Sequence, residues 1–105
     1  MGILTDKLVA EMDELSRLLE NVGENRWGNR VREARSFLSA SNYQGIEAAK
    51  AWFGTVGTLN DLVIHPINGH KVSKENLEQV NSKVRELSSN ILNLVRDIER
   101  NTNFE

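Results

Sequence analysis

The sequence contains no cysteine and a single proline, and none of its apolar runs exceeds three residues. The lack of cysteine excludes disulfides, thiolate metal sites and cysteine nucleophiles, and it is typical of a reducing compartment. A helix that spans a bilayer needs about 20 mostly apolar residues, so no transmembrane segment is predicted. The N-terminus also lacks the basic start and apolar stretch of a secretory signal. We therefore expect a cytoplasmic protein that does not enter a membrane.

The chain also has little net charge, with 13 basic and 15 acidic side chains among 105 residues. This balance argues against nucleic acid as the main ligand. Six acids and two bases lie within residues 1–24, whereas five bases and two acids lie within residues 25–50. Either neighbouring helices of opposite sign pair along their edges, or one of these faces meets a charged partner. The length predicts a single helical domain over residues 1–105.

Apolar residues recur at helical spacing in four segments, namely residues 5–22, 26–40, 43–53 and 73–100. Thr5 and Ser73 stand where N-caps of the first and last helix are expected. Gly23 stands where a glycine commonly ends a helix. The pattern therefore predicts three shorter helices followed by one long C-terminal helix.

The last predicted helix carries a strict heptad pattern of apolar residues between Leu77 and Ile98. Its members are Leu77, Val80, Val84, Leu87, Ile91, Leu94 and Ile98. Such a seam must be covered along its length, either by the three shorter helices or by a second copy of the chain. Short connections and a single core favour the first arrangement, an all-α, mostly antiparallel four-helix bundle. The second arrangement is a homodimer through the seam.

Residues 54–72 form the one long connection, and we expect it to be partly structured because long loops of compact domains usually are, or are functional. Thr58 is expected to cap a short helical turn that starts at Leu59 and also contains Asp61. Pro66 is expected to end this segment, because it forces the residue before it out of helical geometry. The Asn-Gly dipeptide at residues 68–69 predicts a turn that leads to the long helix.

Several polar residues of this connection invite a chemical role, above all Asn60, Asp61 and His65. They either cap turns within the loop or form a contact surface, and a catalytic pair of His65 with Asp61 is the third alternative. The spacing of His65 and His70 matches no metal motif, and Gly54 and Gly57 lack the lysine of a phosphate-binding loop. We therefore expect no metal, no cofactor and no enzymatic activity.

The same stretch resembles a family of small bacterial helical proteins of unknown function. In that family a helix is followed by the motif Gly-x-Gly-Ser/Thr-Leu/Phe-Asn-Asp-Leu. The matching residues here are Gly54 and then Gly57-Thr58-Leu59-Asn60-Asp61-Leu62, after a predicted helix. The resemblance covers about a third of the chain. It implies a protein like the immunity proteins found beside secreted or contact-delivered bacterial toxins.

We therefore expect a bacterial immunity protein that binds a cognate toxin domain, plausibly a nuclease, and occludes its active site. Carboxylates can mimic the phosphates that a nuclease cleft holds. The first helix offers Glu11, Asp13, Glu14 and Glu20, and the loop adds Asn60, Asp61 and His65. Two alternatives remain open at this point. One is a structural or regulatory homodimer through the seam from Leu77 to Ile98, and the other is nucleic-acid binding through Arg26, Arg30, Arg32 and Arg35.

Overall fold

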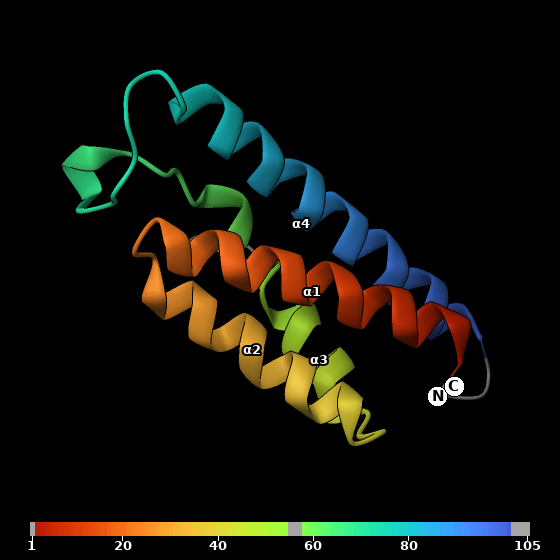
Figure 1. Ribbon diagram of the computed structural model, residues 1–105. Coiled ribbons are helices and arrows are strands. Elements are labelled where there is room, and N and C mark those ends of the chain that lie inside the picture. Colours follow the sequence, from red (N-terminus) through yellow and green to blue (C-terminus); the bar gives the residue numbers. More distant parts are fainter. Residues whose placement is uncertain (1, 55–57, 102–105) are drawn as a thin grey trace.

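A computed structural model describes residues 2–54 and 58–101 and shows an all-α protein (Figure 1). The four helices are α1 (Ile3–Asn21), α2 (Asn25–Ser39), α3 (Gln44–Ala51) and α4 (Leu77–Arg100). Two single 3₁₀ turns, η1 (Leu59–Asp61) and η2 (Pro66–Asn68), lie in the long connection between α3 and α4. The predicted four-helix bundle with a long C-terminal helix and one partly structured loop is confirmed.

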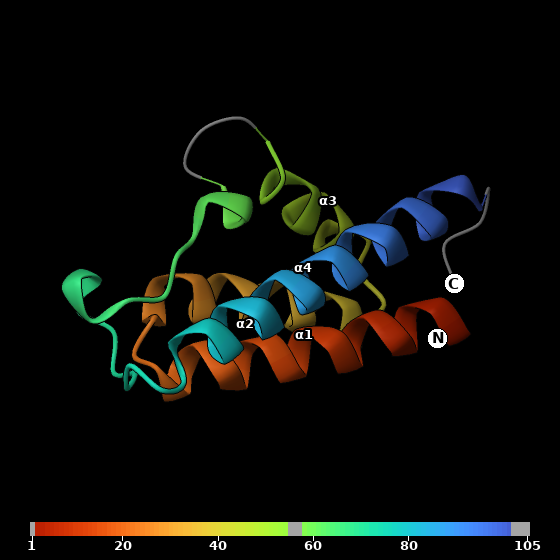
Figure 2. The ribbon, with the colours of Figure 1, turned by 90° about the horizontal axis from the view of Figure 1, so that it is seen from above.

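The helix α1 is the centre of the bundle, because it packs against both α2 and α4. Each of these two neighbours runs antiparallel to α1, as Figures 1 and 2 both show. The short helix α3 packs on α2 and also contacts α4, and η1 contacts α4 beside it. The connection between η1 and α4 extends beyond the end of the α1–α2 hairpin, where η2 forms its tip (Figure 2).

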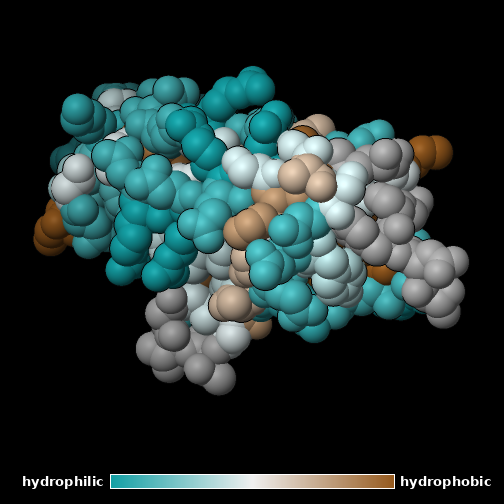
Figure 3. All heavy atoms as spheres, turned by 90° about the horizontal axis from the view of Figure 1, so that it is seen from below, coloured by the Kyte–Doolittle hydropathy of each residue, from teal (hydrophilic) through white to brown (hydrophobic). Residues whose placement is uncertain are grey.

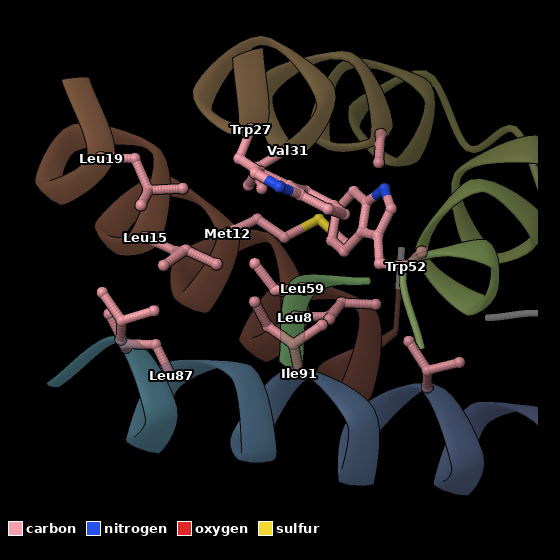
Figure 4. Packing of buried hydrophobic residues seen from close by; sticks show 14 of the residues in the cluster. Leu8, Met12, Leu15, Leu19, Trp27, Val31, Trp52, Leu59, Leu87 and Ile91 are labelled. Carbon is pink, nitrogen blue, oxygen red and sulfur yellow. The ribbon is translucent and has the colours of Figure 1, made fainter. Parts of the chain in front are cut away.

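The core forms between the apolar stripe of α1 and the helices on either side of it (Figure 4). Met12 points toward the indoles of Trp27 and Trp52, while Leu87 and Ile91 approach α1 from α4. All five side chains are buried. Burial of apolar surface stabilises a fold by about 25 cal/mol per Å². This cluster is therefore the main source of stability.

The heptad seam of α4 is covered by the chain's own helices. Val84, Leu87, Ile91 and Ile98 are at most 2% exposed, and Leu94 is half-buried. A second copy has no access to these side chains unless the bundle opens. Intramolecular packing therefore covers most of the seam from Leu77 to Ile98, whereas Leu77, Val80 and Leu94 are partly exposed.

Two predicted N-caps are also wrong. The helix α1 begins at Ile3 with Gly2 as its N-cap, and Thr5 is buried within the first turn. The helix α4 begins at Leu77, and Ser73 instead accepts a turn hydrogen bond of 3.1 Å from the backbone N–H of Asn76. Residues 73–76 are exposed. Helical turns in proteins depend on packing of an apolar face, and here the helix starts only where the seam meets the bundle.

The turns of the long connection agree better with the predictions than these two N-caps do. Thr58 and Asp61 form a reciprocal capping box around η1, as predicted. Gly69 has a φ of 85°, in the left-handed region that suits glycine, so the predicted turn is confirmed. Pro66 was expected to end a helical segment, but it occupies the first position of η2, where a missing N–H costs nothing. The preceding His65 is extended.

Candidate partner-binding surfaces

The long connection is braced against α4 by one amide side chain, that of Asn81. Its Oδ1 accepts a hydrogen bond of 2.8 Å from the backbone N–H of Ile64, and its Nδ2 donates one of 2.8 Å to the Ile64 carbonyl. Nδ2 also donates to the carbonyl of Leu77. Ile64 is fully buried. A single side chain thus satisfies both backbone groups of a buried residue, and without it these groups would need water as their partner.

The other end of the connection is held by a clasp between Glu24 and His70. The Nε2 atom of His70 lies 2.9 Å from Oε1 of Glu24, and Nδ1 accepts a hydrogen bond from the backbone N–H of His65. Because Nδ1 accepts, the ring proton is on Nε2 and is donated to Glu24. The second oxygen of Glu24 accepts from the N–H of Trp27 and caps α2. The clasp therefore joins the loop to the α1–α2 turn.

The pKa of the Glu24 carboxyl is lowered by the hydrogen bonds of this clasp. Burial by itself raises the pKa of the carboxyl, but the hydrogen bonds from His70 and from the backbone N–H of Trp27 outweigh burial and lower it below the ordinary 4.5. A lowered folded-state pKa means stabilisation that is present above the unfolded-state pKa and is lost as the pH falls through the folded-state pKa.

The substitution Glu24→Gln should therefore remove part of the acid dependence of stability. An amide has one acceptor oxygen, so either His70 or Trp27 loses its partner. We expect a loss of about 1–2 kcal/mol in the free energy of unfolding at pH 7, and a difference from wild type that shrinks below pH 4.5. Urea titrations between pH 3 and 8 measure this, with the exposed Glu33→Gln as control. A constant difference across that range would contradict the clasp.

Between the clasp and the loop lies a small cleft of about 280 Å³. Arg26 and Trp27 line it from α2, and Asp61 and Val63 line it from the connection. Val63 precedes η2 and Ile67 lies within it, and their side chains are 55% and 84% exposed. In Figure 3, brown apolar atoms stand out at the end of the molecule where Figure 1 places η2. The loop therefore presents apolar side chains to solvent from a braced backbone.

The three loop residues predicted as contacts do not share one site. Asp61 lines this cleft, and its carboxylate accepts from the N–H of Thr58 at 3.3 Å. Asn60 lies in a separate hollow beside Arg85 of α4. The Nδ1 atom of His65 accepts from the N–H of Ile67, so this imidazole caps η2. Asp61 and His65 thus each have a structural hydrogen bond, and the two are not brought together around a pocket.

The four acids predicted on the first helix divide between two edges of α1. Asp13 pairs with Arg35 of α2 at 2.7 Å, and Glu20 pairs with Arg32. On the opposite edge, Glu14 lies 3.3 Å from Lys83 of α4, and Glu11 accepts a hydrogen bond from Asn90. The expected pairing of oppositely charged helices is found between α1 and α2, at Asp13 and Glu20. Glu11 and Glu14 instead contact residues of α4.

The edge between α1 and α4 is an acidic groove. It comprises a hollow of about 420 Å³ lined by both α1 and α4, and one of about 590 Å³ lined by residues 75–86 alone. Lys83 lines the larger hollow and pairs with Glu86 and Glu14, and hydrogen bonds to these two carboxylates raise its pKa. The groove's charged residues are Glu11, Glu14, Glu75, Glu78, Glu86 and Asp97, against Lys7 and Lys83. Six carboxylates against three cations, these two lysines and Arg100, which pairs with Asp97, give −3, whereas the whole chain carries −2.

The sequence analysis did not predict a role for the acids on α4 or for Glu75 just before it, although their spacing indicated one. Glu75, Glu78, Glu86 and Asp97 fall outside the apolar heptad positions. Positions that flank a buried seam lie at its edges. They meet the acids of α1 only because α1 and α4 are antiparallel neighbours, which the sequence did not specify.

The arginines of α2 do not form one surface. Arg32 and Arg35 pair with acids of α1. The guanidinium of Arg30 lies 4.7 Å from the ring centroid of Trp27, a cation–π contact. Arg26 lines the cleft at the loop. The arginines that were an alternative site for nucleic acid are thus mostly occupied within the bundle.

Within residues 2–54 and 58–101, no group of three or more His, Cys, Asp or Glu side chains is placed to hold a metal ion. In the same residues, no helix has the length and apolarity that a membrane span requires.

Comparison with curated proteins and with solved structures found no match. One family model matches residues 20–73, which is just over half of the chain. The matched segment contains the α1–α2 turn, α2, α3, the loop motif and both members of the Glu24–His70 clasp. The acids of the groove lie outside it. The chain belongs to this family, a domain of unknown function (DUF6966).

Proposed function

We propose that this protein is a bacterial immunity protein that acts in the cytoplasm by binding a cognate toxin domain and occluding its active site. The observation that carries the proposal is the acidic groove between α1 and α4. A nuclease holds its phosphodiester substrate in a basic cleft, so the toxin that fits this groove best is a nuclease. Inhibition by occlusion needs no catalytic group on the inhibitor.

The arrangement of the groove suits this role in two ways. Most of its carboxylates are carried by two packed helices, α1 and α4, so they meet an elongated basic cleft without rearrangement. In addition, Lys83 holds Glu14 and Glu86 in place, although both carboxylates stay about half exposed. Preorganised charges of one sign raise the rate of association with an oppositely charged partner, and this effect weakens with salt.

The proposal predicts that reversing charge in the groove weakens toxin binding. The double variant Glu75→Lys/Glu78→Lys should slow association with the toxin domain encoded beside the gene by about 10- to 100-fold at low salt. Stopped-flow or surface plasmon resonance at two ionic strengths measures this rate. The variant Glu33→Lys/Glu47→Lys is the matched control, because it makes the same charge change on exposed positions of α2 and α3.

Two results would contradict the proposal. One is that the wild-type protein neither binds the neighbouring gene's toxin domain nor protects cells that express it. The other is an equal effect of the groove and control variants, which would assign the effect to net charge alone.

A further inference from the structure

The loop motif contains one polar residue that the fold itself does not use, Asn60. Thr58 and Asp61 form the capping box of η1, and Leu59 is buried. Asn60 is exposed, and its side chain makes no hydrogen bond to the described residues. The two N–H groups of its amide are therefore available to a ligand.

Asn60 lines a hollow of about 160 Å³ between η1 and α4, together with Arg85 and Ser89 of α4. Within residues 2–54 and 58–101, these three side chains make no hydrogen bond or ion pair. By contrast, the hydroxyl of Ser88, which also lines the hollow, donates to the carbonyl of Val84 at 2.7 Å. Two elements thus bring unused hydrogen-bond donors to one small space, and such a set suits an anion.

The charge of the hollow points to an anion as well, because no acidic side chain lines it. Asp61, next to Asn60, lines the cleft near the clasp instead and accepts from the N–H of Thr58. Glu86, next to Arg85, pairs with Lys83. The residues of α4 that lie one helical turn from Arg85 are the uncharged residues 81, 82, 88 and 89. Arg85 therefore contributes the single charge of the lining.

The rest of the lining is apolar and consists of Leu59, Leu62 and Val84. This combination favours a carboxylate over a phosphate. One guanidinium matches one negative charge, and its planar fork binds two carboxylate oxygens in parallel. Since a water molecule takes about 30 Å³ of liquid volume, the hollow has room for a ligand of about five non-hydrogen atoms.

We propose that this hollow binds a carboxylate group on a short aliphatic stem. Arg85 pairs with both oxygens, Asn60 and Ser89 donate hydrogen bonds to them, and the stem contacts Leu62. The hollow shares no residue with the acidic groove, so the site does not depend on the proposed function. A free short-chain acid and a glutamate side chain of another protein both carry such a group.

Titration with sodium propionate at constant ionic strength, followed by amide NMR, tests the site. The shifts of the Asn60 and Ser89 amides should saturate with a dissociation constant on the order of 1–10 mM, because so small a ligand makes few contacts. Arg85→Gln should weaken binding by at least about 10-fold, and Ser89→Ala by about 2- to 5-fold. Arg96→Gln is the matched control, because it makes the same charge change on α4 outside the hollow.

Thermal melts first show that the variants are folded. Saturable binding that Arg85→Gln and Ser89→Ala weaken, and that Arg96→Gln does not, supports the proposal. Shifts that stay linear up to about 100 mM propionate, an equal loss in Arg96→Gln, or tighter binding of inorganic phosphate overturns it. A glutamate tripeptide blocked at both ends distinguishes the two sources. Binding at least as tight as that of propionate assigns the site to a protein side chain, weaker binding assigns it to a free acid, and both results support a carboxylate site.

Discussion

Replacement of Asn81 by leucine is expected to lower the free energy of unfolding by about 2–4 kcal/mol. The side chain of Asn81 is the hydrogen-bond partner of both the N–H and the carbonyl of Ile64. A buried polar group that loses its partner costs about 1–3 kcal/mol. Leucine has a similar shape, so it leaves both groups unpaired and leaves no room for a water molecule to replace the amide.

Denaturant titration measures this loss, and hydrogen exchange locates it. The Ile64 amide should exchange much faster in the variant, because its acceptor is gone. The control is Asn93→Leu, which places the same side chain on the exposed flank of α4. A change of less than about 0.5 kcal/mol for Asn81→Leu, which is the range of ordinary surface substitutions, would show that the brace is not important for stability.

Alanine substitutions at two helical glycines should have effects of opposite sign. A Cβ at Gly45 would lie 2.6 Å from Cγ of Leu38 and 2.8 Å from the carbonyl oxygen of Ala34, so α3 and α2 would have to separate. Overpacking of this kind costs about 1–3 kcal/mol. At Gly28 the nearest atom is the flexible Cγ of Glu20 at 3.4 Å. There alanine should stabilise by about 0.5–1 kcal/mol through its higher helix propensity.

Thermal or urea unfolding of Gly45→Ala and Gly28→Ala checks this contrast, and each variant is the other's control. Both glycines are buried and helical, so helix propensity alone predicts stabilisation at both. If Gly45→Ala also stabilised the protein, the close approach of α2 and α3 would not be the reason for glycine at this position.

Much of the fold was predictable from the sequence because it depends on local chemistry. Helical spacing located all four helices, and the ends of α2 were off by one residue. Thr58 and Asp61 were predicted to start η1, and they do so through a capping box. The errors occur where packing overrides propensity, as at Ser73, which has the side chain of an N-cap but no bundle beside it to stabilise a helical turn.

The candidate surfaces were less predictable, because they depend on which elements become neighbours. Glu11 and Glu14 look the same in sequence as Asp13 and Glu20, yet two face α4 and two pair with α2. His70 was predicted to lie in the long connection, and its spacing from His65 matched no metal motif. It closes a clasp with Glu24, 46 residues away. No local pattern encodes a contact between residues so distant in the chain.

The sequence by itself thus determined the all-α class, the long amphipathic α4 and the chemistry of the turns, because periodicity and capping act over a few residues. Only the tertiary structure decided that α1 covers the seam of α4, that carboxylates gather in one groove, and that Asn81 and the clasp hold the loop with its apolar side chains outward. These features follow from the antiparallel packing of helices, which places side chains from distant parts of the chain along common edges.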